Sequence, residues 1–298
     1  MPLHGRTCRE RNAGDPDALD IGLVVSSAER DACFRLVYDQ YVERGYAAGD
    51  RSGRRVLVHQ ALPTTTMFRA TAAAAVVGTV TLIADSVLGL PMDSLYAGEL
   101  RPLRASGRRV AEVSALAVAP GTPMTALVRL MSRLVLYAEA LARVDDLCVT
   151  VHPRHARFYE RLGFARMGTV KPYAAVNGAP AVAFRLDLAS ALAARASRAA
   201  CARRFVVDAA RAAILTRLTE EQPRAVLTPA EFMRFFVGQR ALADASSRVR
   251  ALLQSFHSDL QLENVDVAGK EATTVLGSAK PYGRKAVVQS SWQITSVR

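Results

Sequence analysis

The sequence predicts an α/β fold in which a mixed central sheet is flanked by helices and followed by a C-terminal helical appendage. Half of the 298 residues are hydrophobic and 22% are charged, which is enough apolar material for a folded core. Hydrophobic residues recur at the spacing of strands in some segments and of helices in others. A strand, a long helix and a second strand follow one another between residues 109 and 151, and this order requires the two strands to pair in parallel.

The first elements are a strand, a helix and a hairpin. Ile21–Val25 has the pattern of a strand, and Ala28–Ala48 has apolar residues at helical spacing. Met67–Ala72 and Val76–Ile83 have the period-two pattern of paired strands, with Gly78 expected near the bend between them. These segments predict a β-hairpin that follows the first helix.

The middle of the chain contains the predicted crossover. Pro91–Ser106 predicts a helix that ends at Gly107, and Arg109–Val118 predicts an alternating strand. Thr122–Arg143 predicts a long amphipathic helix, and Leu147–Val151 a buried strand. Along the alternating strand, one face is expected to carry Val110, Glu112 and Ser114, and the other Ala111, Val113 and Ala115.

Beyond the crossover, His155–Leu162 predicts a short helix ended by Gly163, and Ala165–Val170 and Ala181–Leu188 predict further extended segments. The patterns predict three regions: an α/β domain over residues 1–190, a helical appendage over residues 191–256, and a loop-rich or disordered tail over residues 257–298.

The chain is strongly basic, with a net charge of +12 and an isoelectric point near 10.1, which indicates an anionic partner. The charge is not gathered into one block, so we expect no nucleic acid. The basic helix Arg195–Arg217 would allow peripheral contact with a membrane. No apolar run is long enough to cross a bilayer and no secretory signal is recognised, so we expect a cytoplasmic protein. The four cysteines lie far apart and are expected to be free thiols.

Glu112 is the most informative residue for chemistry, because it lies within a strand of residues suited to burial. One interpretation is an edge position or an ion pair with Arg109 or Arg129. The other is a general base whose pKa is raised by loss of water and which takes a proton from an incoming ammonium group.

Polar residues also gather after the strand Leu147–Val151, where open α/β sheets usually bind ligands. Tyr159 could pack the short helix on the sheet, or its phenol could protonate a departing thiolate. Arg154 could bind a substrate carboxylate or lie on the surface. His152 and His155 lack an obvious third ligand, so no metal site is predicted.

Several segments resemble known families. Phe158–Phe164 resembles the closing helix signature of the GNAT acyltransferase superfamily. The resemblance to the long-chain N-acyl amino acid synthases (FeeM type) is stronger and covers residues 21–188. It rests on four separated blocks: Leu62–Phe68, Asp85–Asp93, Arg108–Val118, and Lys171–Tyr173 with Val176–Ala181.

This resemblance implies a GNAT-like acyltransferase fold and the transfer of a long fatty acyl group from an acyl carrier protein thioester to the amino group of an amino acid. No cofactor is expected to be bound; the acyl-phosphopantetheine of the carrier protein is a co-substrate, and acyl-CoA is an alternative donor. GNAT enzymes grip the CoA pyrophosphate with a glycine-rich loop at a helix N-terminus. Here Ala119–Ala126 contains two prolines and no Gly-x-Gly, which favours the carrier protein as donor.

The mechanism expected from this resemblance is direct attack of the amine on the thioester. Glu112 would act as the base, backbone N–H groups beside the strand would stabilise the oxyanion, and Tyr159 would return a proton to sulfur. Further substrate-binding candidates are Ser114, Arg154 and His155, with Leu88, Leu90 and Met92 as the wall of an acyl channel. Candidates for binding an acidic carrier protein are Arg101, Arg104, Arg108, Arg129 and Arg133.

Three alternative functions stay open at the level of sequence. The first is a CoA-dependent GNAT N-acetyltransferase that acts on a small amine. The second is an enzyme like the acyl-homoserine lactone synthases, which would consume S-adenosylmethionine. The third is a binding module for lipid or carrier protein without catalytic activity.

Overall fold

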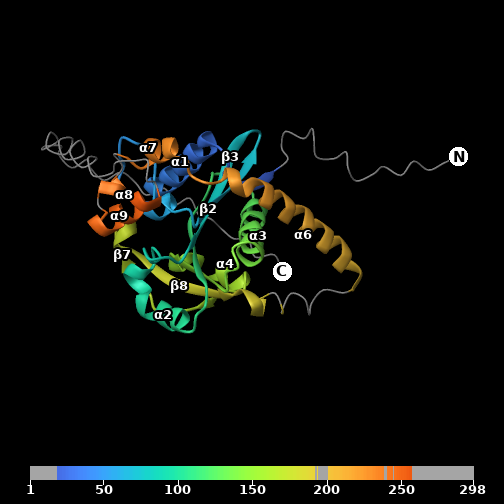
Figure 1. Ribbon diagram of the computed structural model, residues 1–298. Coiled ribbons are helices and arrows are strands. Elements are labelled where there is room, and N and C mark those ends of the chain that lie inside the picture. Colours follow the sequence, from blue (N-terminus) through green and yellow to red (C-terminus); the bar gives the residue numbers. More distant parts are fainter. Residues whose placement is uncertain (1–18, 192, 194–200, 238–239, 244, 257–298) are drawn as a thin grey trace, which may run out of the picture.

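A central β-sheet organises the molecule in the computed structural model, which describes residues 19–191, 193, 201–237, 240–243 and 245–256 (Figure 1). The strand order is β1-β2-β3-β4-β5-β8-β6, and β7 pairs with β8. Among the described strands, only β4 and β5 pair in parallel, and the other neighbouring strands are antiparallel. The strands are β1 (Asp20–Leu23), β2 (Thr65–Ala72), β3 (Ala75–Ala84), β4 (Val110–Val118), β5 (Asp146–Val151), β6 (Ala165–Arg166), β7 (Lys171–Tyr173) and β8 (Ala179–Asp187).

The mixed sheet and its parallel crossover confirm the prediction from sequence. The helices before residue 190 include α1 (Ser27–Glu43), α2 (Asp93–Ala105), α3 (Met124–Ala140) and α4 (Ala156–Arg161), with 3-10 turns η1 (Val58–Ala61), η2 (Pro153–His155) and η3 (Ala174–Val176). A further helical segment begins at residue 188, directly after β8. Helix α1 begins at a capping box in which the Glu29 N–H donates to Ser26 Oγ at 3.2 Å. It ends five residues before the predicted Ala48, because Gly45 adopts a φ of +71° there.

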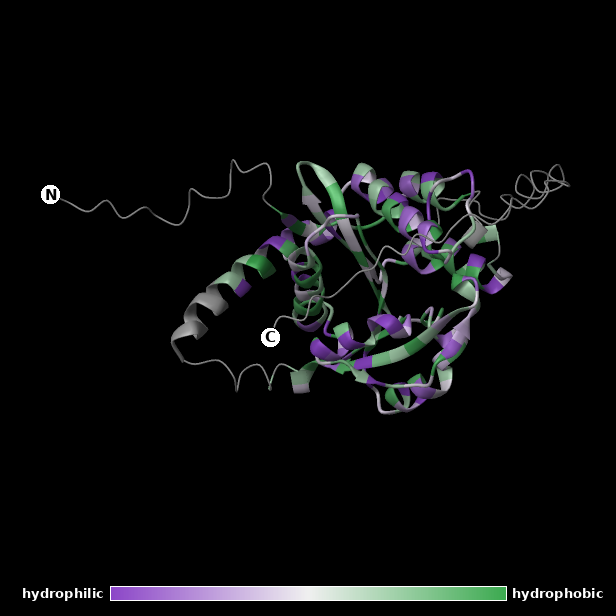
Figure 2. Ribbon diagram, turned by 180° about the vertical axis from the view of Figure 1, so that it is seen from behind, coloured by the Kyte–Doolittle hydropathy of each residue, from purple (hydrophilic) through white to green (hydrophobic). Residues whose placement is uncertain are grey.

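The two faces of the sheet are covered by different helices. On one face, α3 and α4 pack on a hydrophobic cluster that includes Ala111, Val113 and Tyr159. On the other face, α2 packs on Val110, and α1 packs on β3 and β4. Figure 2 shows hydrophobic residues along the central strands and on α3, with many hydrophilic residues on the outer helices. The direction in which a β4 side chain points therefore decides which pair of helices it meets.

The hairpin of β2 and β3 turns at Ala73 and Ala74, and the prediction that Gly78 lies near the bend is wrong. Ala72 pairs with Ala75, and the two residues between them have φ values of +46° and +62°. Both residues of a two-residue hairpin turn of this kind need positive φ. Gly78 lies inside β3, opposite Ala70.

The β4 strand changes its facing direction at Ala115. This residue has a φ of +49°, and the register with β3 shifts between Thr79 and Thr81. The extra residue of this bulge turns Ala115 toward Val37 of α1, so the prediction that Ala115 shares a face with Ala111 is wrong. The parallel pairing of β4 with β5 ends at Val113 and Val149, although β4 continues to Val118 and β5 to Val151.

The described residues after position 200 are largely helical, as predicted. They form α6 (Cys201–Glu221), η4 (Gln222–Arg224), α7 (Pro229–Phe235), α8 (Arg240–Ala243) and α9 (Ser247–Phe256). Figure 1 shows α6 beside α3. The predicted basic helix Arg195–Arg217 begins outside the described residues, as does the predicted tail 257–298 in full, and membrane contact stays a prediction. No helix in the described ranges has both the length and the apolar character that a membrane span needs.

The C-terminal helices share a hydrophobic core with the N-terminal part of the chain. Phe232, Phe235 and Phe236 are buried with Phe34 of α1. The Glu221 carboxylate accepts the Leu23 N–H of the edge strand β1 at 2.7 Å, and the buried Arg30 Nε lies 3.3 Å from Glu231 Oε1. These contacts attach the C-terminal helices to α1 and β1.

Candidate active site

Glu112 is buried in the middle of the sheet, with 3% of its surface exposed. It lies in β4, between Ile83 of β3 and Cys148 of β5. Its Oε2 accepts the N–H of Met92, the N-cap residue of α2, at 2.8 Å. Burial raises the pKa of Glu112 to about 8. The Met92 N–H stabilises the anion and lowers the pKa, whereas the negative charge of Asp93 raises it further.

The alternative interpretations of Glu112 are not supported. β4 is a central strand, so Glu112 is not at an edge. Arg109 pairs with Asp145, and Arg129 donates to the Leu19 carbonyl at 3.2 Å. Within the described residues Glu112 forms no ion pair. A buried carboxylate without a cation partner and with a pKa near neutral is suited to moving protons.

Two tyrosines that the sequence did not point to lie close to Glu112. Burial and the charge of Glu112 raise the pKa of Tyr173 to about 12, and the Tyr173 hydroxyl donates to the Pro91 carbonyl at 3.2 Å. Burial also raises the pKa of Tyr41, which Arg55 lowers and Glu112 raises further. Tyr41 matched the apolar stripe of its helix, and Tyr173 belonged to a resemblance block without a role, so neither carried a signal of its own.

Tyr159 is buried on the other face of the sheet. Its ring stacks on Phe184, with 6.4 Å between the ring centres, and meets Phe164 edge-on at 5.5 Å. No hydrogen bond of its hydroxyl is found within the described part of the chain. Burial and the nearby Tyr41 phenol raise the pKa of Tyr159, so it stays protonated at neutral pH.

Glu112 and Tyr159 can act on one substrate only where the sheet is open. The pairing of β4 with β5 ends one residue beyond Glu112, although both strands continue past this point. Ser114, which is half-buried, lies at this point beside the bulge. A substrate held between the separated strands could contact groups from both faces.

The residues that follow β5 form a polar rim. The Arg154 guanidinium is exposed and donates to Tyr46 Oη at 2.9 Å and to His155 Nε2 at 3.1 Å. The His152 ring stacks on Tyr46. Burial and the charge of Arg154 lower the pKa of His155 to about 4, so it is neutral at pH 7. No three His, Cys, Asp or Glu side chains are grouped as a metal site in the described ranges.

The residues predicted to line an acyl channel pack against the protein itself. Leu90 and Met92 are buried in a cluster with Tyr96 and Leu100 of α2. Leu88 is half-buried against the cluster that contains the C-terminal helices. A channel at this place stays a prediction.

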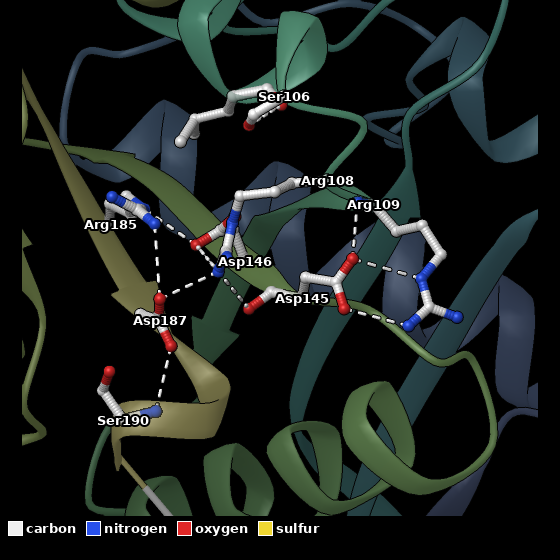
Figure 3. A network of polar contacts seen from close by, with 9 residues as sticks. Ser106, Arg108, Arg109, Asp145, Asp146, Arg185, Asp187 and Ser190 are labelled. Carbon is white, nitrogen blue, oxygen red and sulfur yellow. Dashed lines mark hydrogen bonds and ion pairs between the residues drawn. The ribbon is translucent and has the colours of Figure 1, made fainter.

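Two of the arginines predicted to bind a carrier protein are ion-paired. Arg104 contacts Asp85 at 2.5 Å and Asp93 at 2.6 Å. Arg108 pairs with the fully buried Asp146 in the network of Figure 3, where Arg185 Nε also lies 2.7 Å from Asp146. This network joins the first residues of β4 and β5 to the end of β8, and its arginines have structural partners.

The five predicted carrier-binding arginines do not form one surface. Helix α2 and helix α3 cover opposite faces of the sheet. Only the α3 pair lies on the face of Tyr159. The α2 residues are Arg101 and Arg104, and the α3 residues are Arg129 and Arg133.

Two cavities lie apart from Glu112. One, of about 200 Å³, lies between β1, α3 and α6 and is lined by residues such as Arg133 and Arg217. The other, of about 240 Å³, lies beside Arg108 and Arg143. Glu112 lines neither of them.

Comparison with known proteins identifies the class of enzyme. The structure of FeeM, an N-acyl amino acid synthase from uncultured soil microbes, matches with 33% identity and a TM-score of 0.53, over 59% of this chain and 93% of that chain. The AHL synthase LasI matches at 17% identity (TM-score 0.45, 57% of this chain and 89% of the other). An N-acetyltransferase from Staphylococcus aureus Mu50 matches at 15% (TM-score 0.42, 57% and 98%). A search of curated proteins found no match.

The likeness to the FeeM structure confirms the predicted acyltransferase fold with a mixed central sheet flanked by helices, and the family match makes the chain an N-acyltransferase. The profile of the family described as N-acyl amino acid synthase FeeM matches residues 32–187, more than half of the chain. The chain belongs to this family.

Proposed function

We propose that this enzyme transfers a long-chain fatty acyl group from an acyl carrier protein thioester to the amino group of an amino acid. The buried Glu112 carries this proposal, because its raised pKa and its place beside the opening of the sheet suit a base that receives a proton from an ammonium group. The amine reaches Glu112 from the face of α1 and α2. The acyl donor approaches from the face of α3 and α4, where Tyr159 lies.

The proposed reaction balances with these two residues. Glu112 takes one proton from the ammonium group, and the amine nitrogen then attacks the thioester carbonyl. Backbone N–H groups of β4 beside the bulge stabilise the oxyanion. As the carbon–sulfur bond breaks, Tyr159 gives its proton to the sulfur and receives the second proton of the nitrogen. The products are an amide and a free thiol, and the proton on Glu112 returns to water.

The start of α3 supports a carrier protein rather than CoA as donor. Pro120 and Pro123 have no N–H to offer, and the Thr122 and Ala126 N–H groups donate to backbone carbonyls within the same turn. Few donors are then left to bind a pyrophosphate, which CoA has and carrier-bound phosphopantetheine lacks. For the acidic carrier protein, Arg129 and Arg133 are the candidates on the donor face. Such a donor and free amino acids fit an enzyme of the cytoplasm.

The test uses the purified chain with one long-chain acyl group presented either on acyl carrier protein or on CoA, together with the twenty amino acids. Mass spectrometry should find an N-acyl amino acid with the carrier-bound donor. The E112Q variant should lose about 10²- to 10⁴-fold in rate. Replacement of the exposed Glu160 by Gln is the matched control and should have no effect.

Each contrary result has a distinct meaning. Product from acyl-CoA alone would reject the carrier protein as donor. A parallel reaction offers S-adenosylmethionine in place of the amino acids, and its consumption with a lactone product would favour an autoinducer synthase. Wild-type activity in E112Q would remove Glu112 from the mechanism, and no amide with either donor would reject the proposed function.

A further inference from the structure

Arg55 has a guanidinium group that no described carboxylate neutralises. It lies in the segment between α1 and η1 and is half-buried. Its Cζ lies 4.5 Å from the centre of the Tyr41 ring, and its Nη2 donates to the Ala175 carbonyl at 2.8 Å. The preceding Arg54, by contrast, contacts Asp31 at 2.5 Å. A guanidinium has five N–H donors, so most of those of Arg55 are open to a ligand.

A short series of contacts connects Arg55 with Glu112. The turn that accepts the Arg55 hydrogen bond directly follows Tyr173, whose hydroxyl donates to the Pro91 carbonyl at 3.2 Å. The next residue, Met92, donates its N–H to Glu112 at 2.8 Å. Arg55 and Glu112 therefore lie at the two ends of a continuous series of contacting residues on the same face of the sheet.

The electrostatics of the tyrosines agree with this placement. The charge of Glu112 raises the pKa of both Tyr41 and Tyr173, and the charge of Arg55 lowers both. Each phenol therefore lies within electrostatic range of both the Glu112 carboxylate and the Arg55 guanidinium.

A free amino acid carries the complementary charges. Its ammonium and carboxylate are attached to the same carbon, so an enzyme that acylates it needs a proton acceptor and a cation a short distance apart. A planar guanidinium can hold a carboxylate through two parallel hydrogen bonds, and its stacking on an aromatic ring fixes the plane in advance. The ring below Arg55 is that of Tyr41.

We propose that Arg55 binds the α-carboxylate of the amino acid and holds its nitrogen toward Glu112. The inference rests on the proposed function and assigns the substrate-binding role that the sequence gave to Arg154. Arg154 is exposed, and two of its nitrogen atoms are already engaged with Tyr46 and His155. Arg55 is the better placed of the two because it lies on the same face as the base.

The test compares two substrates in R55Q: the amino acid that the wild type acylates fastest, and the amine that remains when its carboxylate is removed, such as phenethylamine for phenylalanine. R55Q should raise KM for the amino acid about 10- to 100-fold with little change in kcat, because the lost contact exists before and during the reaction. Its kcat/KM for the amine should equal that of the wild type, and R55K should recover part of the loss.

The exposed Arg51 lies four residues earlier in the same segment, and R51Q is the matched control that should leave KM unchanged. R154Q tests the alternative that Arg154 binds the substrate carboxylate. An unchanged KM in R55Q, an equal loss on amino acid and amine, or a larger loss in R154Q would each overturn the role of Arg55.

A binding experiment keeps this inference separate from the proposed function. Isothermal titration of the full chain with phenylalanine and phenethylamine, and with leucine and 3-methylbutylamine, measures the preference for a carboxylate without turnover. The wild type should prefer the amino acids and R55Q should not. If the wild type forms no amide, the proposed function fails. Independently of turnover, if the wild type binds the amines as tightly as the amino acids, the proposed role of Arg55 fails.

Discussion

Glu112 is a carboxyl group that is mostly protonated at neutral pH. Its burial raises the pKa to about 8, and only the ionised form can accept a proton from the substrate. We expect kcat/KM to rise about tenfold per pH unit well below pH 8 and to level off above it. The measurement is a pH profile between pH 5 and 10. A profile that is flat through pH 6 to 9 would show that ionisation of this group does not limit the reaction.

Tyr159 is suited to protonate the leaving sulfur because burial keeps its phenol protonated. Y159F removes only the oxygen, whose hydrogen-bonding capacity the described chain does not use, and should retain the fold. We expect kcat to fall about 10- to 100-fold with little change in KM. Tyr137 is the matched control: it is also buried, but its hydroxyl contacts Thr66 Oγ1 at 3.2 Å. Equal kcat values in Y159F, Y137F and the wild type would leave Tyr159 with a packing role.

The β2–β3 hairpin has a turn whose backbone does not suit its residues. Ala73 and Ala74 both have positive φ, which costs L-residues about 1–2 kcal/mol each and suits Asn followed by Gly. The double variant A73N/A74G should raise the free energy of unfolding by about 1 kcal/mol, measured by chemical denaturation.

The neighbouring Ala75 provides the control for this prediction. It is a paired strand residue, and A75G should lower the free energy of unfolding by about 0.5–1 kcal/mol. If A73N/A74G were less stable than the wild type, the turn would have another geometry in solution.

The helices after residue 200 extend the hydrophobic core instead of standing apart from it. Phe235 is fully buried, with its ring centre 5.4 Å from that of Phe34. F235A should lower the free energy of unfolding by about 3–5 kcal/mol, because it leaves a cavity in this shared core. Exposed Met233 lies on the same helix, and M233A should cost less than about 1 kcal/mol.

Denaturant unfolding measures both variants, and a single transition is expected. An F235A midpoint equal to that of the wild type, or a separate transition for the C-terminal helices, would contradict a shared core.

Phe235 also lies under Arg54, with 5.9 Å between the guanidinium carbon and the ring centre. If Arg55 binds the substrate carboxylate, F235A should raise KM for the amino acid as well.

Local patterns along the chain were sufficient for the order of strands and helices, the parallel crossover and the burial of Glu112. Hydrophobic spacing, caps and turn residues act over a few positions, and the side chains of such a stretch carry the information. The bulge at Ala115 was not predicted, because the alternating pattern of the sequence continues through this position. The extra residue shows only in the pairing of β4 with β3 and in the positive φ of Ala115.

Long-range packing was needed for the rest of the site. Tyr41, Arg55 and Tyr173 come from segments more than 100 residues apart at their extremes, and nothing near any of them in the chain indicates a common site. The same holds for the pairing of Arg104 and Arg108 with aspartates. It also holds for the placement of the other predicted carrier-binding arginines on helices that cover opposite faces of the sheet. The spacing of hydrophobic residues determines whether a segment forms a helix or a strand, because that spacing acts over a few positions. The tertiary structure decides which charged side chains form pairs, because an electrostatic interaction depends on the distance between groups in space and not on their separation along the chain.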